Sequence, residues 1–193
     1  MSILIIGDSN TFGYQPGGGR YLAADRWPDL VRQALAPRQV RIEGQNGRFF
    51  SGNLCGAGGL ADGQGVLHRS LALDMPATLI LQLGTNDLLV GLGVAVLADA
   101  LYQTLAPLAE DCQVIGILPR ALDPLEGDLA FGPAWMVQAC RALARDLQSR
   151  PLPANLTWME GEDAWIEPFD GIHLSASGHH HLAVRVLELV AHG

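Results

Sequence analysis

The chain has 193 residues, with 12 Lys+Arg against 20 Asp+Glu and hence a formal net charge of −8. Apolar residues make up 49% of the chain and charged residues 17%, which excludes a disordered protein. Every basic side chain is arginine, and a chain without lysine cannot be a Schiff-base enzyme or carry a Walker-type phosphate loop.

The same composition sets expectations about partners and compartment. An acidic chain is not expected to bind nucleic acid or an anionic membrane surface, because both need clustered basic side chains. No apolar run approaches the roughly 18 residues that span a bilayer, and the first one, Ile3–Ile6, is too short for a signal peptide. An odd number of cysteines without metal-ligand spacing predicts free thiols and a cytoplasmic protein, namely Cys55, Cys112 and Cys140. At this length a single domain over residues 1–193 is expected.

Short apolar runs alternate with longer amphipathic segments along the chain. The short runs predict strands at Ser2–Ile6, Val40–Ile42, Thr78–Leu83, Val114–Leu118 and Leu156–Met159. The amphipathic segments predict helices at Asp29–Leu35, Val66–Leu73, Val94–Leu108, Trp135–Leu147 and Leu182–Ala191, with Ser175 as the N-cap of the final helix. Alternating strands and helices predict a flavodoxin-like three-layer α/β/α sandwich with a five-stranded parallel sheet.

Glycines cluster mostly after the first three predicted strands, at Gly13–Gly19, Gly44–Gly65 and Gly84–Gly93. Ligands of open parallel sheets bind outside the carboxyl ends of the strands, so these clusters favour a site there. Ordinary turn chemistry is an equal alternative for any single glycine.

Two segments offer the residues of nucleophilic catalysis. Gly7-Asp8-Ser9-Asn10 follows the first strand and places Ser9 on a strand-to-helix turn, where a base could activate its hydroxyl. Asp170-Gly171-Ile172-His173 precedes the final helix, and a carboxylate three residues before a histidine can accept from its Nδ1–H and leave Nε2 as a base. Taken alone, a surface Asp and a surface His would be the commoner interpretation.

Two further segments offer hydrogen-bond donors at the same edge of the sheet. Gly84-Thr85-Asn86-Asp87 ends the third strand, and the Asn86 side chain can donate an N–H into the crevice, although a turn or cap role is commoner. Gly44-Gln45-Asn46-Gly47-Arg48 follows the second strand and can offer a backbone N–H. Asp8 and Asp87 are predicted to fix their loops by accepting from backbone N–H groups.

In this order the four segments resemble the SGNH (GDSL-type) hydrolases, and the resemblance runs from Ile3 to about Ala183. The stretches closest to the arylesterase or acyltransferase-like branch are Gly7–Tyr14, Arg26–Pro28, Glu43–Arg48 and Asp170–Ser175. The resemblance implies that Ser9 is the nucleophile, His173 the general base and Asp170 its orienting acid. It also implies an oxyanion hole made by the backbone N–H groups of Ser9 and Gly47 and the side-chain amide of Asn86. Such a site needs no metal and no cofactor.

The chain departs from the family pattern at two places. Position 10 is Asn where the family's name-giving residue is Leu. Phe49-Phe50 stands where Thr-Thr is expected, which predicts a bulkier pocket wall.

The run His179-His180-His181 suggests a metal site at first sight. Consecutive helical residues point about 100° apart, so three of them cannot converge on one ion. The run is predicted to be a solvated or interface helix face, and no metal is expected.

Apolar residues near the motifs are candidates for substrate binding: Phe12, Leu89, Leu92, Phe131 and Trp135. The last two lie at the end of a long connection, Asp123–Pro133, and long loops often wall a pocket. The apolar Leu88–Leu92 segment fits either an acyl or aryl group or the interface of a homo-oligomer.

These observations predict a serine esterase acting on small acyl or aryl esters, with acyl transfer to alcohols as a further outcome. A thioesterase or lysophospholipase on the same site is the alternative within the enzyme class. In another class, a non-catalytic flavodoxin-like module could hold a nucleotide or phosphate at Gly13–Gly19 and the helix after the first strand. That alternative gives no reason for Asn86 and the Asp170/His173 pair to occur together.

Overall fold

A parallel sheet of five strands forms the centre of the computed structural model, which describes residues 2–122, 135–168 and 170–192. The strands are β1 (Ile3–Gly7), β2 (Val40–Gly44), β3 (Thr78–Gln82), β4 (Gln113–Ile117) and β5 (Leu156–Met159). Their order is β2-β1-β3-β4-β5, and every neighbouring pair is parallel. This is the flavodoxin-like order, so the predicted fold class is confirmed.

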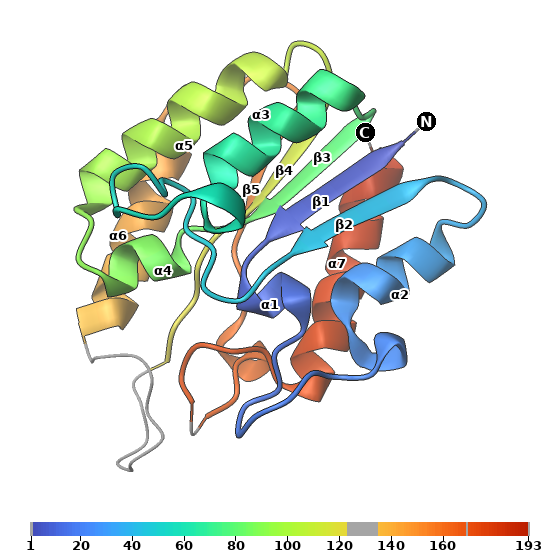
Figure 1. The fold of residues 1–193 in the computed structure, drawn as a ribbon, viewed down its shortest axis with the longest axis horizontal. Coiled ribbons are helices and arrows are strands. Elements are labelled where there is room, and N and C mark those ends of the chain that lie inside the picture. The colour runs from blue at the N-terminus through green and yellow to red at the C-terminus, as the bar shows by residue number, and fades with distance from the viewer. Residues whose placement is uncertain (1, 123–134, 169, 193) are drawn as a thin grey trace.

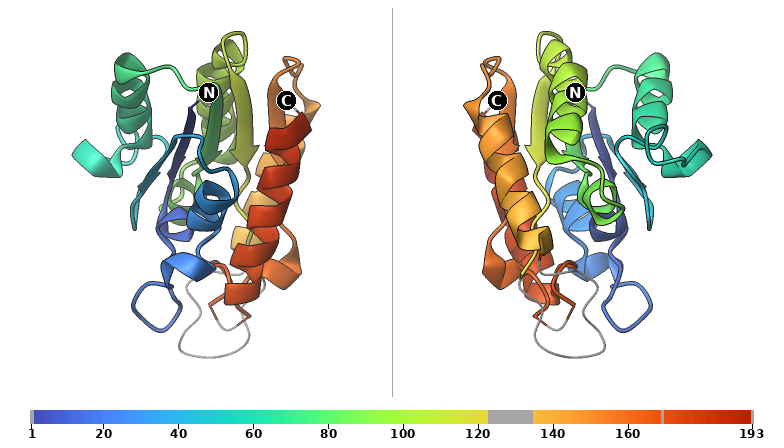
Figure 2. Two further views of the ribbon diagram at one scale, coloured as in Figure 1. Left: turned by 90° about the vertical axis from the view of Figure 1, so that its right-hand side faces the viewer. Right: turned by 90° about the vertical axis from the view of Figure 1, so that its left-hand side faces the viewer.

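Helices cover both faces of the sheet (Figure 1). On one face α3 (Gly63–Leu73), α5 (Val94–Leu108) and α6 (Trp135–Ser149) bury residues such as Leu67 and Leu101 against the strands. On the other face α2 (Trp27–Ala34) and α7 (Ala176–His192) contribute Trp27, Val31 and Val186 to a second core. Seen edge-on, the sheet lies between two layers of helices (Figure 2).

Two short helices outside the amphipathic segments named above lie at the carboxyl ends of the central strands. Helix α1 (Ser9–Phe12) follows β1, and α4 (Thr85–Leu89) follows β3. Each is a single turn, too short to produce a detectable apolar period. Three 3₁₀ turns at Ala23–Asp25, Gly59–Ala61 and Asp163–Trp165 complete the described elements. The starts of α1 and α4 are thereby brought to the edge of the sheet where a ligand is expected.

The apolar stripe predicted that the final helix begins at Leu182, but the helix begins at Ala176. Ser175 is its N-cap, because the Gly178 N–H donates to the Ser175 hydroxyl at 3.0 Å. The prediction that the three consecutive histidines form a solvated or interface helix face is wrong for His179, which is buried within the chain. Its side chain is fully buried against α2, where the Trp27 N–H donates to Nδ1 at 3.4 Å. Within the described ranges no cluster of metal-ligating side chains is present.

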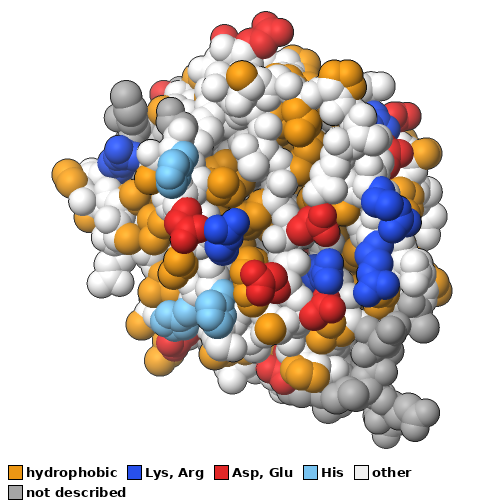
Figure 3. All heavy atoms as spheres, turned by 180° about the vertical axis from the view of Figure 1, so that it is seen from behind, with side chains coloured by type: hydrophobic (Ala, Val, Ile, Leu, Met, Phe, Trp, Pro, Cys, Tyr) orange, Lys and Arg blue, Asp and Glu red, His pale blue; other side chains and the backbone are white. Residues whose placement is uncertain are grey.

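The surface carries side chains of both charges. On the face that contains α7, basic and acidic side chains are interspersed rather than gathered by sign (Figure 3). Among the described residues no helix is long and apolar enough to cross a membrane. The three cysteines, Cys55, Cys112 and Cys140, are free as predicted.

Buried His179 makes the free energy of unfolding depend on pH. Burial lowers the pKa of His179 from 6.5 to about 3, so the unfolded chain binds an extra proton between these values. The stability contributed by neutral His179 therefore falls by about 1.4 kcal/mol per pH unit as the pH drops below 6.5. Burial raises the pKa of Asp8 from 3.8 to about 6, which gives an opposite slope between those two values.

The variant His179→Asn isolates the histidine contribution, because the Asn oxygen can still accept from the Trp27 N–H but does not titrate in this range. We expect the stability difference between wild type and variant to shrink by about 1.4 kcal/mol per unit as the pH falls from 6.5 towards 4. Urea unfolding of both proteins at several pH values measures this. A difference that stays constant with pH would contradict the assignment of His179 as a buried neutral residue.

Candidate active site

Ser9 is the first residue of α1, directly after the turn that leaves β1. Asp8 is the N-cap, and its carboxylate accepts from the Asn10 N–H at 3.0 Å. The turn requires Gly7, since a Cβ there would lie 1.9 Å from Thr11 Oγ1 and 2.9 Å from the Gln82 carbonyl oxygen. The backbone N–H groups of a first helical turn have no partner inside the helix. Ser9 therefore presents both a hydroxyl and a backbone donor at the helix start.

His173 and Asp170 come from the turn that precedes α7, and they reach Ser9 from the other end of the sequence. His173 Nε2 lies 2.9 Å from Ser9 Oγ, and Nδ1 lies 2.9 Å and 3.0 Å from the two oxygens of Asp170. The predicted contact between Asp170 and Nδ1 is thus present. An Nδ1–H that donates to a carboxylate leaves Nε2 unprotonated and facing the serine hydroxyl.

The surroundings keep Asp170 ionised. Burial alone would raise the pKa of Asp170, but the hydrogen bond and charge of His173 outweigh it and lower the pKa. The backbone N–H groups of Ile172 and His173 also donate to Oδ1, at 3.1 Å and 2.7 Å. A carboxylate held in this way can fix the orientation of the imidazole and stabilise its protonated form.

Gly47 lies in a turn after β2 in which the Arg48 N–H donates to the Gln45 carbonyl at 3.3 Å. Its φ of +69° is in the left-handed region, which favours glycine at this place in a turn. Arg48 is buried, and its guanidinium donates to the carbonyl oxygens of Gly7, Glu43 and Leu60. One side chain therefore ties the end of β1, the end of β2 and the long loop after β2 together.

Asn86 is the second residue of α4, and its Nδ2 donates to the Arg48 carbonyl at 2.9 Å. A side-chain amide has two N–H donors, so this bond orients the group and leaves a second donor. Asp87 accepts from the N–H groups of Phe50 and Ser51, both at 2.7 Å. The prediction that Asp8 and Asp87 fix their loops through backbone N–H groups is confirmed.

These groups surround one pocket of about 240 Å³, lined by Ser9, Tyr14, Asn46, Gly47, Thr85, Asn86, Leu89, Ile172 and His173. The structure thus brings the predicted nucleophile, base and three oxyanion donors to the same cavity. Of the predicted substrate-binding residues, Leu89 lies in its wall.

The other apolar candidates lie elsewhere. The Phe12 ring is covered by the Arg20 guanidinium 4.1 Å away, Leu92 packs against the core, and Trp135 is exposed at the start of α6. None of the three is among the residues that line the pocket. Phe131 and the whole of the predicted loop Asp123–Pro133 lie outside the described residues.

The expectation of a bulkier wall from Phe49-Phe50 is also wrong. Phe50 is fully buried in the core between the sheet and its helices, and Phe49 is absent from the pocket lining. Their backbones instead fix the loop beside the site. The Phe50 N–H donates to the Asp87 carboxylate, and Phe49 forms a parallel β-bridge with Asp62.

Several wall residues were not singled out from the sequence. Asn46, Thr85 and Ile172 each precede a predicted site residue, so adjacency to the motifs was the available signal. Tyr14 comes from the loop after α1, and its ring centre lies 4.6 Å from that of His173. That contact depends on tertiary structure and leaves no pattern in the sequence.

Replacing the buried Arg48 is expected to lower stability more than replacing a less connected arginine. The variant Arg48→Met would leave three carbonyl oxygens without this donor, at a cost of about 1–3 kcal/mol for each one that stays buried. Arg41→Met is the matched control, because Arg41 makes a single hydrogen bond, to the Ser70 carbonyl. Denaturant unfolding should show a clearly larger loss for Arg48→Met, and equal losses would contradict the prediction.

Comparison with known proteins gives the family. The model of the GDSL-like Lipase/Acylhydrolase family matches residues 5–181. The chain belongs to this family. As a GDSL-type acylhydrolase it is a carboxylic ester hydrolase, and the predicted SGNH resemblance is confirmed.

Solved structures agree with the fold of a GDSL-type acylhydrolase. A carbohydrate acetylesterase family member from Sinorhizobium meliloti is 22% identical, with a TM-score of 0.81 over 98% of this chain and 96% of that one. The native M. smegmatis aryl esterase is also 22% identical, with a TM-score of 0.74 over 98% of each chain. A search of curated proteins found no match.

Proposed function

We propose that this GDSL-type acylhydrolase is a serine esterase that cleaves small acyl or aryl esters through an acyl-enzyme on Ser9. The observation that carries the proposal is the 2.9 Å contact between Ser9 Oγ and His173 Nε2 inside the pocket. A hydroxyl in hydrogen-bond contact with a base that is itself oriented by a carboxylate is the arrangement that activates a serine.

In the proposed reaction His173 Nε2 takes the Ser9 proton while Oγ attacks the ester carbonyl carbon. The resulting oxyanion accepts from the N–H groups of Ser9 and Gly47 and from the second N–H of Asn86. His173 then gives its proton to the leaving alcohol, and the acyl group stays on Ser9. A water molecule, deprotonated by His173, releases the acid and restores the serine. Neither a metal nor a cofactor takes part.

The pocket supports a small, apolar acyl or aryl group. Its volume is about 240 Å³, and Tyr14, Leu89 and Ile172 give it apolar walls beside Ser9. The solved relatives named above are a carbohydrate acetylesterase and an aryl esterase, which is in keeping with short esters. If an alcohol attacked the acyl-enzyme in place of water, the enzyme would act as an acyltransferase.

Fluorophosphonate labelling of the purified protein, with mass mapping of the modified peptide, tests the proposal. We expect modification at Ser9 and none in Ser9→Ala, whereas the control Ser51→Ala should label like wild type. A protein that hydrolyses esters without labelling at Ser9 would refute it. Rates on p-nitrophenyl esters of increasing chain length, and on an acyl thioester, then separate a short-chain esterase from a thioesterase or lysophospholipase.

A further inference from the structure

We infer that Asn10 is a positioning residue for the general base, and that it fixes His173 against the nucleophile through two hydrogen bonds. The inference rests on the proposed function, in which His173 takes the Ser9 proton. Its starting point is that Asn10, the residue after the nucleophile, is buried and has both ends of its carboxamide hydrogen-bonded.

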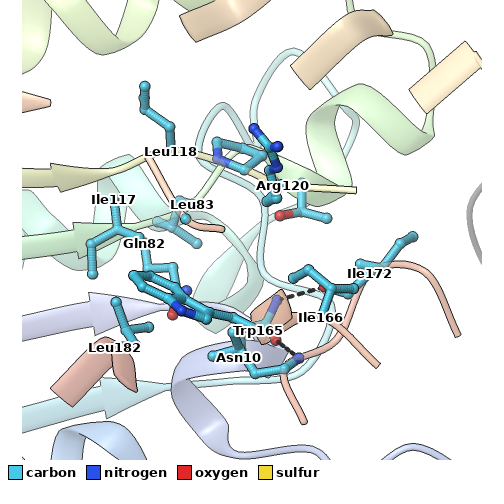
Figure 4. A pocket seen from close by; sticks show the side chains of 14 residues that line it. Asn10, Gln82, Leu83, Ile117, Leu118, Arg120, Trp165, Ile166, Ile172 and Leu182 are labelled. Carbon is cyan, nitrogen blue, oxygen red and sulfur yellow. Dashed lines mark hydrogen bonds between the residues drawn. The ribbon is translucent and has the colours of Figure 1, made fainter. Parts of the chain in front are cut away.

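The Asn10 carboxamide spans the peptide groups on either side of His173. Its Nδ2 donates to the Ile172 carbonyl at 3.3 Å, and its Oδ1 accepts from the Leu174 N–H at 2.8 Å. Figure 4 shows both bonds beside a small cavity. A parallel strand would bond the residues before and after a given residue in the same way. The side chain thus takes the place of a neighbouring strand along this turn.

These two bonds join the turn directly to α1. The bonds of Asp170 to Ile172, His173 and the imidazole lie within the turn and would move with it. Asn10, by contrast, follows Ser9 in the same helical turn, so its bonds fix the backbone of His173 relative to the serine. This connection links the backbone that carries Nε2 to the residue that follows Ser9, across 164 residues of sequence.

Packing alone does not hold the turn at this place. Asn10, Ile172 and Leu174 all border the cavity, which has a volume of about 20 Å³ and leaves space beside the turn. Ile172 and Leu174 are 2% and 3% exposed, so without Asn10 their carbonyl and N–H would be buried and unpaired. A leucine could fill the volume but could satisfy neither group, and the turn would shift to recover hydrogen bonds.

The experiment compares Asn10→Leu with Thr11→Val on the next residue of α1. Thr11 is also buried, and its hydroxyl donates to Gln82 at 2.8 Å, away from the turn. Both variants replace a buried polar side chain by an apolar one of similar size. We expect kcat on p-nitrophenyl acetate and the rate of fluorophosphonate labelling to fall roughly 10- to 100-fold in Asn10→Leu, with KM little changed. In Thr11→Val the melting temperature falls while kcat stays within about twofold.

Placing both variants in a His173→Ala background separates positioning from a merely structural role. If Asn10 acts through His173, Asn10→Leu costs no further activity once the base is absent. An equal loss in both backgrounds, or a folded Asn10→Leu with wild-type kcat, overturns the inference. If Asn10→Leu does not fold, Asn10→Asp keeps the acceptor for Leu174, removes the amide donor to Ile172, and must meet the same two criteria. Failure of the proposed function is distinct, since wild type would then not label at Ser9.

Discussion

Replacing Ser9 by alanine is expected to lower kcat by a factor on the order of 10⁴ or more while leaving the melting temperature close to that of wild type. The hydroxyl contacts His173 at the edge of a pocket and fills no space in the core, so its loss removes chemistry rather than packing. Steady-state kinetics on p-nitrophenyl acetate and thermal unfolding measure the two quantities. Activity above roughly a few per cent of wild type would mean that another group is the nucleophile.

The same prediction extends to the base. His173→Ala should cost about as much as Ser9→Ala, and the double variant should be little worse than either, because the two groups act as one unit. Losses that multiply would show that the two side chains work in separate steps. Ser51→Ala serves as the control for both variants.

The second large effect is expected at Asn86. Asn86→Ala should lower kcat by on the order of 10²–10³, or about 3–4 kcal/mol of barrier, because a donor to the oxyanion is lost. KM should change little, since the charge that this donor stabilises develops only in the transition state. Fluorophosphonate labelling of Ser9 should slow in parallel, because the phosphonyl oxygen occupies the same position.

The control for Asn86 is Asn155→Ala, which removes another side chain that donates to one backbone carbonyl, that of Ala109, far from the pocket. It should leave kcat unchanged. If Asn86→Ala raised KM at constant kcat, Asn86 would bind the ground state. If it lowered only the melting temperature, its bond to the Arg48 carbonyl would be its main contribution.

The sheet could be predicted because buried parallel strands are short, continuous apolar runs. Thr78–Leu83 and Leu156–Met159 therefore stood out, and the structure ends β3 one residue earlier and gives β5 the same bounds. The start of α7 was indicated only by its predicted N-cap, Ser175, because its first turn is mostly polar and adds nothing to the apolar stripe. A Cβ on Gly178 would lie 2.0 Å from the Trp165 carbonyl oxygen, a contact that no periodic pattern reports.

The chemistry of the site followed from local spacing, as with Asp170 and His173 three residues apart in one turn. The pocket walls did not, because they come from loops whose path is set by distant contacts. Trp135 and Leu92 are residue types that commonly line apolar pockets. In the structure Trp135 is exposed and Leu92 packs on the core. Asn10 was recognised as a departure from a motif, but its partners lie 162 and 164 residues away.

The chain supplies the nucleophile from the short helix after its first strand and the base from the turn before its last helix. Between Ser9 and His173 lie nearly all the strands and helices, so their hydrogen bond cannot form until the final segment docks on the sheet. Opening of α7 alone would carry His173 away and leave Ser9 in its helix, with most of the core intact. Activity would then be lost at lower denaturant concentration than the helical circular dichroism signal. Esterase turnover would therefore report the fraction of molecules in which α7 is docked on the sheet.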